Sequence, residues 1–117
     1  MLPPENRLKK EKEIKRALAG KIAAGGAALS LRAAATDLPA TRFCFVVSKR
    51  VSKKASARNL VKRRLRAAAS ALMRRIIPGF DCAVIARSGA EKKTYRELAV
   101  EMEKILAKSR LLAPQSL

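Results

Sequence analysis

The sequence predicts a single small α+β domain, and three observations support this fold class. The chain has 117 residues, which suit one domain well and two domains poorly. Hydrophobic residues make up 49% of it, enough for a packed core despite a high charge. Segments with helical periodicity alternate with short apolar runs, in the order helix, strand, strand, helix, strand, helix.

The first half of the chain predicts one helix and two strands. The helix is expected over residues 9–19, where Ile14 and Leu18 share one face, with a glycine after it as the C-terminal stop. A weak strand is expected over residues 27–35, after two adjacent glycines that break the chain. The strongest strand signal covers residues 42–47, where Phe, Val and Cys are concentrated.

A long helix is expected over residues 57–77. Ser56 is the expected N-cap, and Pro78 and Gly79 end the helix. One stripe of this helix is apolar, with its residues three or four positions apart. The stripe consists of Val61, Leu65, Ala68, Leu72 and Ile76.

The last third of the chain predicts a strand and a helix. Residues 80–86 form an apolar run typical of a central strand. Thr94 and Glu97 form a capping-box pattern that begins the last helix. The apolar stripe of this helix consists of Tyr95, Leu98, Met102, Ile105 and Leu106. We expect an ordered chain over about residues 5–110 and a frayed tail over residues 111–117.

The charge of the chain is +18, from 27 Lys and Arg against 9 Asp and Glu. So large a charge points to a polyanionic partner, either nucleic acid or an anionic membrane surface. The sequence contains no His, which excludes a Ser-His-Asp triad, a Cys-His pair and a His-ligated zinc site. The carboxylates are scattered, which argues against a two-metal nuclease centre.

The cysteines and the N-terminus indicate the setting. Cys44 and Cys82 each lie in an apolar run, so buried thiols are expected rather than a disulfide framework. The N-terminus lacks the apolar run of a signal peptide. No stretch approaches the roughly 18 apolar residues of a membrane span. These features predict a soluble cytoplasmic protein.

Basic charge is concentrated at the start of the long helix. Arg58, Lys62 and Arg66 are four residues apart, so like charges face each other near the positive end of the helix dipole. Stability alone would not favour this arrangement, whereas contact with phosphates would. Asn59 and Arg63 lie in the same band. An ordinary solvent-exposed face explains this concentration of charge less well than a surface that binds phosphates. Further cations precede the helix at Lys49, Arg50, Lys53 and Lys54.

Four segments carry a family resemblance. The run VSKRVSKK at residues 47–54 precedes ARNLVKRRLR at residues 57–66. The run PENRLKK covers residues 4–10, and FDCAVIAR covers residues 80–87. In this order and spacing, they resemble the bacterial ribonuclease P protein subunit over residues 4 to about 108.

The resemblance implies a fold and a division of labour. The implied fold is an αβββαβα sandwich with a left-handed β-α-β crossover, as in the second domain of ribosomal protein S5. In this family an RNA subunit cuts the 5′ leader from precursor tRNA, and the protein supplies no catalytic residues. Magnesium is expected at the active site of the RNA, and the protein holds no metal or other cofactor. The implied partners are the ribonuclease P RNA and precursor tRNA, with no membrane and no small-molecule substrate.

The resemblance also assigns residues to two RNA-binding surfaces. Contacts with the catalytic RNA are expected from Arg58, Asn59, Lys62 and Arg63, supported by Lys49, Arg50, Lys53, Lys54 and Arg66. The cleft for the precursor-tRNA leader is expected to include Ile14, Leu18, Ser30 and Arg32, with Asn6 and Arg7 near its mouth. For Ile14 and Leu18, plain packing in the core is an equally good interpretation. For Asn6 and Arg7, a flexible solvated arm is an equally good interpretation.

Two departures from the family pattern affect these expectations. Leu60 stands where the family's Arg-Asn-Arg motif has its second arginine, with Arg64 nearby as a possible replacement. Ile14 and Leu18 stand where the first helix often has Phe, so van der Waals contact is expected there in place of base stacking. A small ribosomal or RNA-packaging protein without a role in cleavage is the alternative hypothesis. A membrane-active peptide fits poorly, because the helices lack aromatic anchors.

Overall fold

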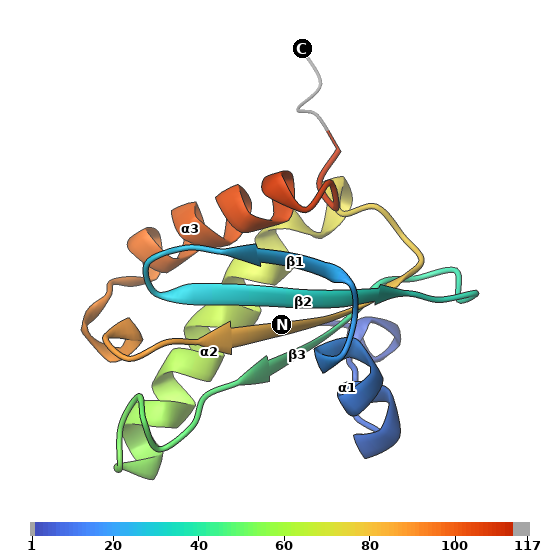
Figure 1. Ribbon diagram of the computed structural model, residues 1–117. Coiled ribbons are helices and arrows are strands. Elements are labelled where there is room, and N and C mark those ends of the chain that lie inside the picture. The colour runs from blue at the N-terminus through green and yellow to red at the C-terminus, as the bar shows by residue number, and fades with distance from the viewer. Residues whose placement is uncertain (1, 114–117) are drawn as a thin grey trace.

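The computed structural model describes residues 2–113, which form one four-stranded sheet with helices on both faces (Figure 1). The strands are β1 (Ile22–Gly25), β2 (Leu29–Ala35), β3 (Arg42–Val46) and β4 (Phe80–Ala86). The α-helices are α1 (Glu11–Leu18), α2 (Ala55–Leu72) and α3 (Tyr95–Lys108). Short 3-10 turns lie at Pro4–Asn6, Met73–Arg75 and Ala90–Lys92. No helix within residues 2–113 is long and apolar enough to cross a lipid bilayer.

The sheet has the order β1-β2-β4-β3. β2 pairs antiparallel with both β1 and β4, and β3 pairs parallel with β4. In Figure 1, β3 and β4 point to the left, β4 lies above β3, and α2 passes behind the sheet. The β3-α2-β4 connection is therefore left-handed, as the family resemblance implies and against the usual right-handed preference.

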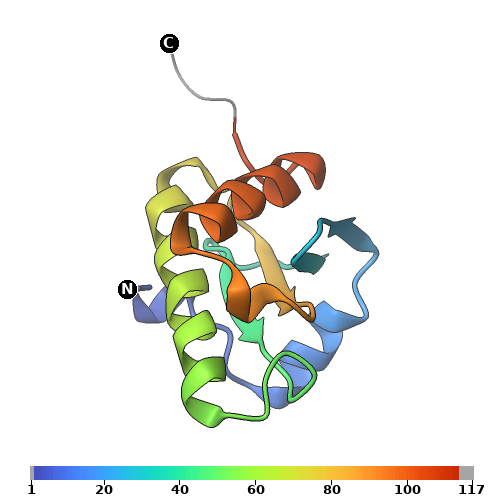
Figure 2. The same ribbon diagram turned by 90° about the vertical axis from the view of Figure 1, so that its left-hand side faces the viewer.

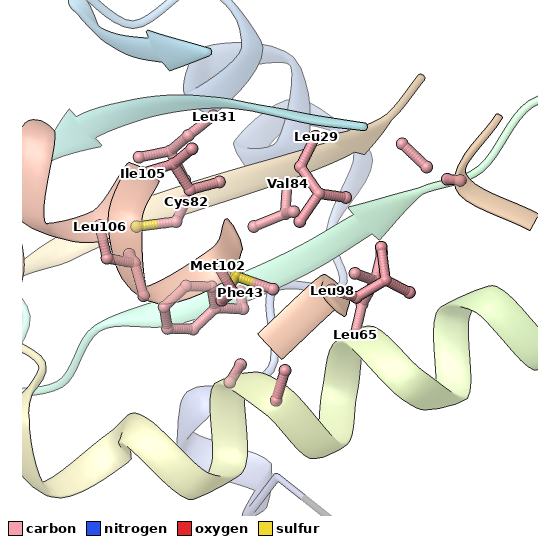
Figure 3. Packing of buried hydrophobic residues seen from close by; sticks show 14 of the residues in the cluster. Leu29, Leu31, Phe43, Leu65, Cys82, Val84, Leu98, Met102, Ile105 and Leu106 are labelled. Carbon is pink, nitrogen blue, oxygen red and sulfur yellow. The ribbon is translucent and has the colours of Figure 1, made fainter. Parts of the chain in front are cut away.

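The main core lies between the sheet and the pair α2 and α3 (Figures 2 and 3). Alternate residues of each strand point into it, and the buried stripes of the two helices close over them. Its fully buried members include Leu29, Leu31, Leu65, Val84, Leu98, Met102, Ile105 and Leu106. The Ala-rich composition makes this an aliphatic core, with Phe43 as its buried aromatic ring.

A smaller cluster joins α1 to the opposite face of the sheet. Leu8, Ala17 and Ala83 are its buried members, and Ile14 and Leu18 pack against them from α1. Small residues on the sheet let α1 approach closely. This face is covered by α1 over only part of its area (Figure 2).

Strand β1 is the element that the residue patterns did not predict, although the family resemblance implied it. Its sequence, Ile-Ala-Ala-Gly, has one β-branched residue and is otherwise poor in strand formers. Tertiary contacts stabilise it instead. Glu101 of α3 accepts a hydrogen bond of 2.8 Å from the N–H of Ala28 in the β1–β2 turn. This bond ties the hairpin to α3.

The helix boundaries differ from the sequence expectations. α1 is shorter than residues 9–19, and α2 begins two residues before the expected 57–77 helix. The N-cap of α2 is Lys54, which makes no side-chain capping bond, so Ser56 is not the cap. α2 ends at Leu72 because the following residues turn away and Ile77 N–H donates to the carbonyl of Leu111 at 2.9 Å.

The capping box of α3 is confirmed. Thr94 Oγ1 accepts from Glu97 N–H at 3.1 Å, and Glu97 Oε1 accepts from Thr94 N–H at 2.9 Å. Tyr95 does not belong to the buried stripe, because it is 41% exposed. Residue Leu111 is buried, so the expected frayed tail of residues 111–117 packs onto the fold at its start; residues 114–117 lie outside the described part.

Candidate nucleic-acid interface

The first candidate surface is the α2 band, which we define as Arg58, Asn59, Lys62, Arg63 and Arg66. Val61 and Leu65 are buried on the core side of the same helix. Asn59, Arg63 and Arg66 are exposed, whereas Arg58 and Lys62 are partly buried. One helix thus combines a core face with a basic face, as the sequence predicted.

Arg58 organises the loop that precedes α2. Its Nη1 donates to the carbonyls of Ser52 and Lys53, both at 3.0 Å. Val51 of this loop is buried, which fixes the loop to the core. The loop presents exposed cations beside the start of α2; they are Lys49, Arg50, Lys53 and Lys54.

The start of α2 is open to an anion. Lys54 provides no side-chain cap, and the first turn has no acidic residue. The first N–H groups of a helix have no partners within the helix and carry partial positive charge. Together with the surrounding cations, they make this end of α2 electrostatically positive.

The second candidate surface is the part of the sheet that α1 leaves uncovered. Ser30 and Arg32 of β2 point to the same face of the sheet as α1, because the alternate residues of β2 enter the main core. A hollow of about 430 Å³ lies here, with both residues in its wall. The rest of its wall is formed by Ala23, Ala24, Gly25, Leu31, Ile85 and Arg87.

Arg87 is a residue of this surface that the sequence reasoning missed. It is exposed and lines the hollow together with Arg32. Its position directly after an apolar strand was the available signal, because strand ends often place polar side chains at the rim of a sheet face. The two arginines give the otherwise small-residue hollow a positive charge.

Ile14 and Leu18 do not form part of the wall of this hollow. Both are partly buried and pack against the sheet beneath α1. Arg32 links the two regions, since its Nη1 donates to the carbonyl of Gly20 at 3.1 Å. The structure therefore places Ser30 and Arg32 together and gives Ile14 and Leu18 a packing role beneath α1.

Asn6 and Arg7 are held in place along the edge of β3. Asn6 is 9% exposed, and its Nδ2 donates to the carbonyl of Thr41 at 2.8 Å. Arg7 forms a parallel bridge with Phe43, and its Nε donates to the carbonyl of Leu2 at 2.8 Å. These contacts make the segment part of the fold and not a flexible arm.

Arg64 faces away from the α2 band. Its Nη1 donates to the carbonyl of Lys93 at 2.7 Å, which joins α2 to the turn before α3. Leu60 is 38% exposed. Arg64 is therefore occupied by a structural contact and does not replace the arginine that the motif has at Leu60.

A buried ion-pair network beneath α1 was also missed by the sequence reasoning. Arg42 of β3 binds Asp81 of β4 through two hydrogen bonds of 2.8 Å and reaches Glu13 of α1 at 3.2 Å. The hydrogen bond with Asp81 raises the pKa of Arg42 further above its usual range. An aspartate inside an apolar strand was the signal, because a buried carboxylate requires a partner.

Metal ligands are sparse on both surfaces. Among residues 2–113, His, Cys, Asp and Glu nowhere form a group of three or more that could hold a metal ion.

The fold and its two surfaces define a basic α+β protein that is suited to bind a polyanion at more than one place. Comparisons with known proteins identify the family. The ribonuclease P family model matches residues 2–110. The ribonuclease P protein component of Pseudanabaena sp. is 36% identical over 113 residues, which cover 96% of this chain and 97% of that protein. The corresponding protein of Picosynechococcus sp. is 32% identical over 105 residues, which cover 90% of each chain.

A solved structure agrees in fold. The ribonuclease P protein of Staphylococcus aureus superimposes with a TM-score of 0.83 at 22% identity, covering 92% of this chain and 97% of that one. The chain belongs to the ribonuclease P protein family.

Proposed function

We propose that this chain assists the removal of the 5′ leader from precursor tRNA as the protein subunit of a ribonuclease P whose RNA subunit performs the cleavage. The α2 band binds the catalytic RNA. The uncovered face of the sheet binds the leader. The single observation that carries this proposal is that a family member has, on two separate surfaces, cations that form no ion pair within residues 2–113.

The α2 band suits a folded RNA. Its exposed members, Asn59, Arg63 and Arg66, project from a rigid helix, so their spacing is fixed. Arg58 keeps the preceding basic loop against the helix start. A rigid, basic helix with an open N-terminus contacts several phosphates at once and releases their counterions.

The uncovered sheet face suits a single strand. Ala23, Gly25 and Ser30 leave the hollow shallow enough for an extended chain, and Arg32 and Arg87 supply charge for its phosphates. Ile14 and Leu18 support α1, which forms the border of this face. A surface of this kind holds a strand by backbone contacts and depends little on base sequence.

The assignment of the chemistry to RNA rests on the side chains. The sequence has no His, and the buried carboxylate Asp81 is occupied by Arg42. General acid–base catalysis needs a titratable group that can reach the substrate. The cations of the two surfaces can bind and orient the phosphates of RNA.

Reconstitution tests the proposal. The protein is combined with the ribonuclease P RNA of the same genome and a precursor tRNA, and the 5′ end of the product is mapped. We expect no cleavage by the protein alone, and with the RNA we expect a lower magnesium requirement and correct 5′ ends. Cleavage without the RNA, or no effect on the activity of the RNA, would contradict the proposal.

A further inference from the structure

A second hollow, of about 470 Å³, lies at the β3 edge of the sheet, between α2 and the N-terminal segment. Its volume is within the range of about 300–1,000 Å³ that is typical of small-ligand sites. We call it the β3-edge pocket. Its charged and aromatic lining consists of Arg7, Lys9, Phe43, Phe45, Lys62 and Arg66.

The charge of the pocket is uncompensated. Arg7, Lys9, Lys62 and Arg66 line it, and its wall contains no acidic residue. Within the described part of the chain, none of these cations takes part in an ion pair. Arg7 uses its Nε for the carbonyl of Leu2, which leaves its terminal nitrogens for a ligand. Four like charges around one hollow repel each other, and a bound anion removes that repulsion.

The pocket also contains an aromatic wall. The rings of Phe43 and Phe45 are nearly parallel, at an interplanar angle of 6° and a centroid distance of 6.1 Å. Phe43 is 2% exposed, whereas Phe45 is only partly buried and presents its ring to the hollow. A base stacks on such a ring, and nearby cations hold its phosphate.

The walls of the pocket are fixed before any ligand binds. Leu8 N–H donates to the carbonyl of Phe43 at 2.9 Å, and Asn6 is bonded to Thr41. Leu2 is buried in the main core at the start of the same segment. The N-terminal segment is therefore held against β3 as a permanent wall, which lowers the entropic cost of binding.

We propose that the β3-edge pocket binds one unpaired RNA nucleotide, with its base against Phe45 and its phosphate among the four cations. This inference rests on the proposed function, because RNA is the polyanion that such a protein meets. It adds a base-stacking site that the first helix, with Ile14 and Leu18, does not offer. The nucleotide comes either from the catalytic RNA or from the leader, which share this chemistry.

Two substitutions test the pocket away from the α2 band. Phe45→Leu keeps the apolar packing but removes the ring, whereas Phe45→Tyr keeps the ring. Lys9→Gln removes one pocket cation. The matched controls are Phe80→Leu, a partly buried phenylalanine outside the pocket, and Lys10→Gln, the exposed neighbour of Lys9.

Binding is measured in two arms. The first arm uses the ribonuclease P RNA alone, and the second compares precursor tRNA with and without its leader on the assembled RNA–protein complex. We expect Phe45→Leu to weaken binding about tenfold in one arm, with Phe45→Tyr close to wild type. Lys9→Gln should reduce the salt dependence by about one phosphate contact in the same arm, while the controls match wild type. The affected arm identifies the source of the nucleotide.

The outcomes separate the pocket from the proposed function. If Phe45→Leu and Lys9→Gln both match wild type in both arms, the pocket proposal is wrong, even though the wild-type protein still assists its RNA. If the wild-type protein does not assist the RNA at all, the proposed function itself is wrong. If Phe45→Leu lowers the melting temperature, the comparison of Lys9→Gln with Lys10→Gln tests the pocket proposal instead, because both lysine side chains lie at the surface.

Discussion

Arg42 and Asp81 form a bidentate pair across the parallel strands β3 and β4. Arg42 Nε lies 2.8 Å from Asp81 Oδ1, and Arg42 Nη2 lies 2.8 Å from Asp81 Oδ2. The Asp81 side chain is fully buried, and Arg42 also pairs with Glu13 on α1 at 3.2 Å. The pair therefore fastens α1 to the sheet and sets the border of the uncovered face.

Removal of one partner of this pair should be costly. We expect Arg42→Ala to lower the free energy of unfolding by about 3–5 kcal/mol, because the buried Asp81 carboxylate then keeps only Arg16, a largely exposed cation at 3.5 Å, as a counter-charge. Urea denaturation measures this loss. The double variant Arg42→Met, Asp81→Leu should recover most of it, since no buried charge then remains. Equal stability of the single variant and wild type would show that the pair does not hold α1.

Gly20 should tolerate no larger residue. It lies between the end of α1 and β2, where a Cβ atom would collide with the carbonyl group of Ala33. We expect Gly20→Ala to destabilise the fold by about 1–3 kcal/mol, as overpacking does elsewhere. Gly25→Ala is the matched control, because there a Cβ meets only the end of the flexible Arg87 side chain. Thermal melting of both variants checks the difference.

The two thiols should make the stability fall at high pH. Burial raises the pKa of Cys44 to about 11 and that of Cys82 to about 12, with a contribution from the charge of Asp81. The pKa of a thiol in the unfolded chain is about 8.5. A raised thiol pKa in the folded state stabilises the fold below this pH, and the stabilisation is lost as the pH rises through the folded-state pKa values.

Urea midpoints at pH 8 and pH 10 measure this effect. We expect the midpoint of the wild type to fall more between these pH values than that of the double variant Cys44→Ala, Cys82→Ala. A thiol reagent at pH 8 should modify native protein slowly, since the thiolate is the reactive form. Rapid modification of the native protein at pH 8 would contradict the raised pKa of the two thiols.

Arg63 and Arg58 should differ in what their loss affects. Arg63 is exposed, so Arg63→Ala should reduce the salt dependence of RNA binding by about one contact and leave the melting temperature unchanged. Arg58→Ala should also disorder the preceding loop, because Arg58 bonds the carbonyls of Ser52 and Lys53. Salt titrations and proteolysis of the loop distinguish the two variants. Identical behaviour would refute the anchoring role of Arg58.

The sequence predicted elements whose signal is local. β4 was expected over residues 80–86 and has these bounds, because its residues, apolar except for Asp81, lie between Gly79 and the polar turn after the strand. The capping box of α3 was visible for the same reason, since Thr94 and Glu97 are three residues apart. The basic face of α2 also follows from spacing along a single helix.

Contacts between distant segments could not be predicted in this way. β1 consists of weak strand formers and depends on its pairing with β2 and on Glu101, far along the chain. Arg42 and Asp81 are separated by 39 residues, so no local pattern joins them. The β3-edge pocket combines three segments, and only the folded chain brings Arg7 next to Lys62.

We propose that two separate surfaces of this protein bind two different RNAs. The most direct test uses the matched variants Arg32→Gln and Arg63→Gln on the assembled complex, and measures the affinity for precursor tRNA relative to leaderless tRNA. We predict that Arg32→Gln lowers this ratio by about tenfold and leaves the affinity for the ribonuclease P RNA unchanged. Arg63→Gln should weaken the ribonuclease P RNA affinity and, at saturation, leave the ratio unchanged. The reverse pattern, or a loss of both properties in both variants, would contradict the claim.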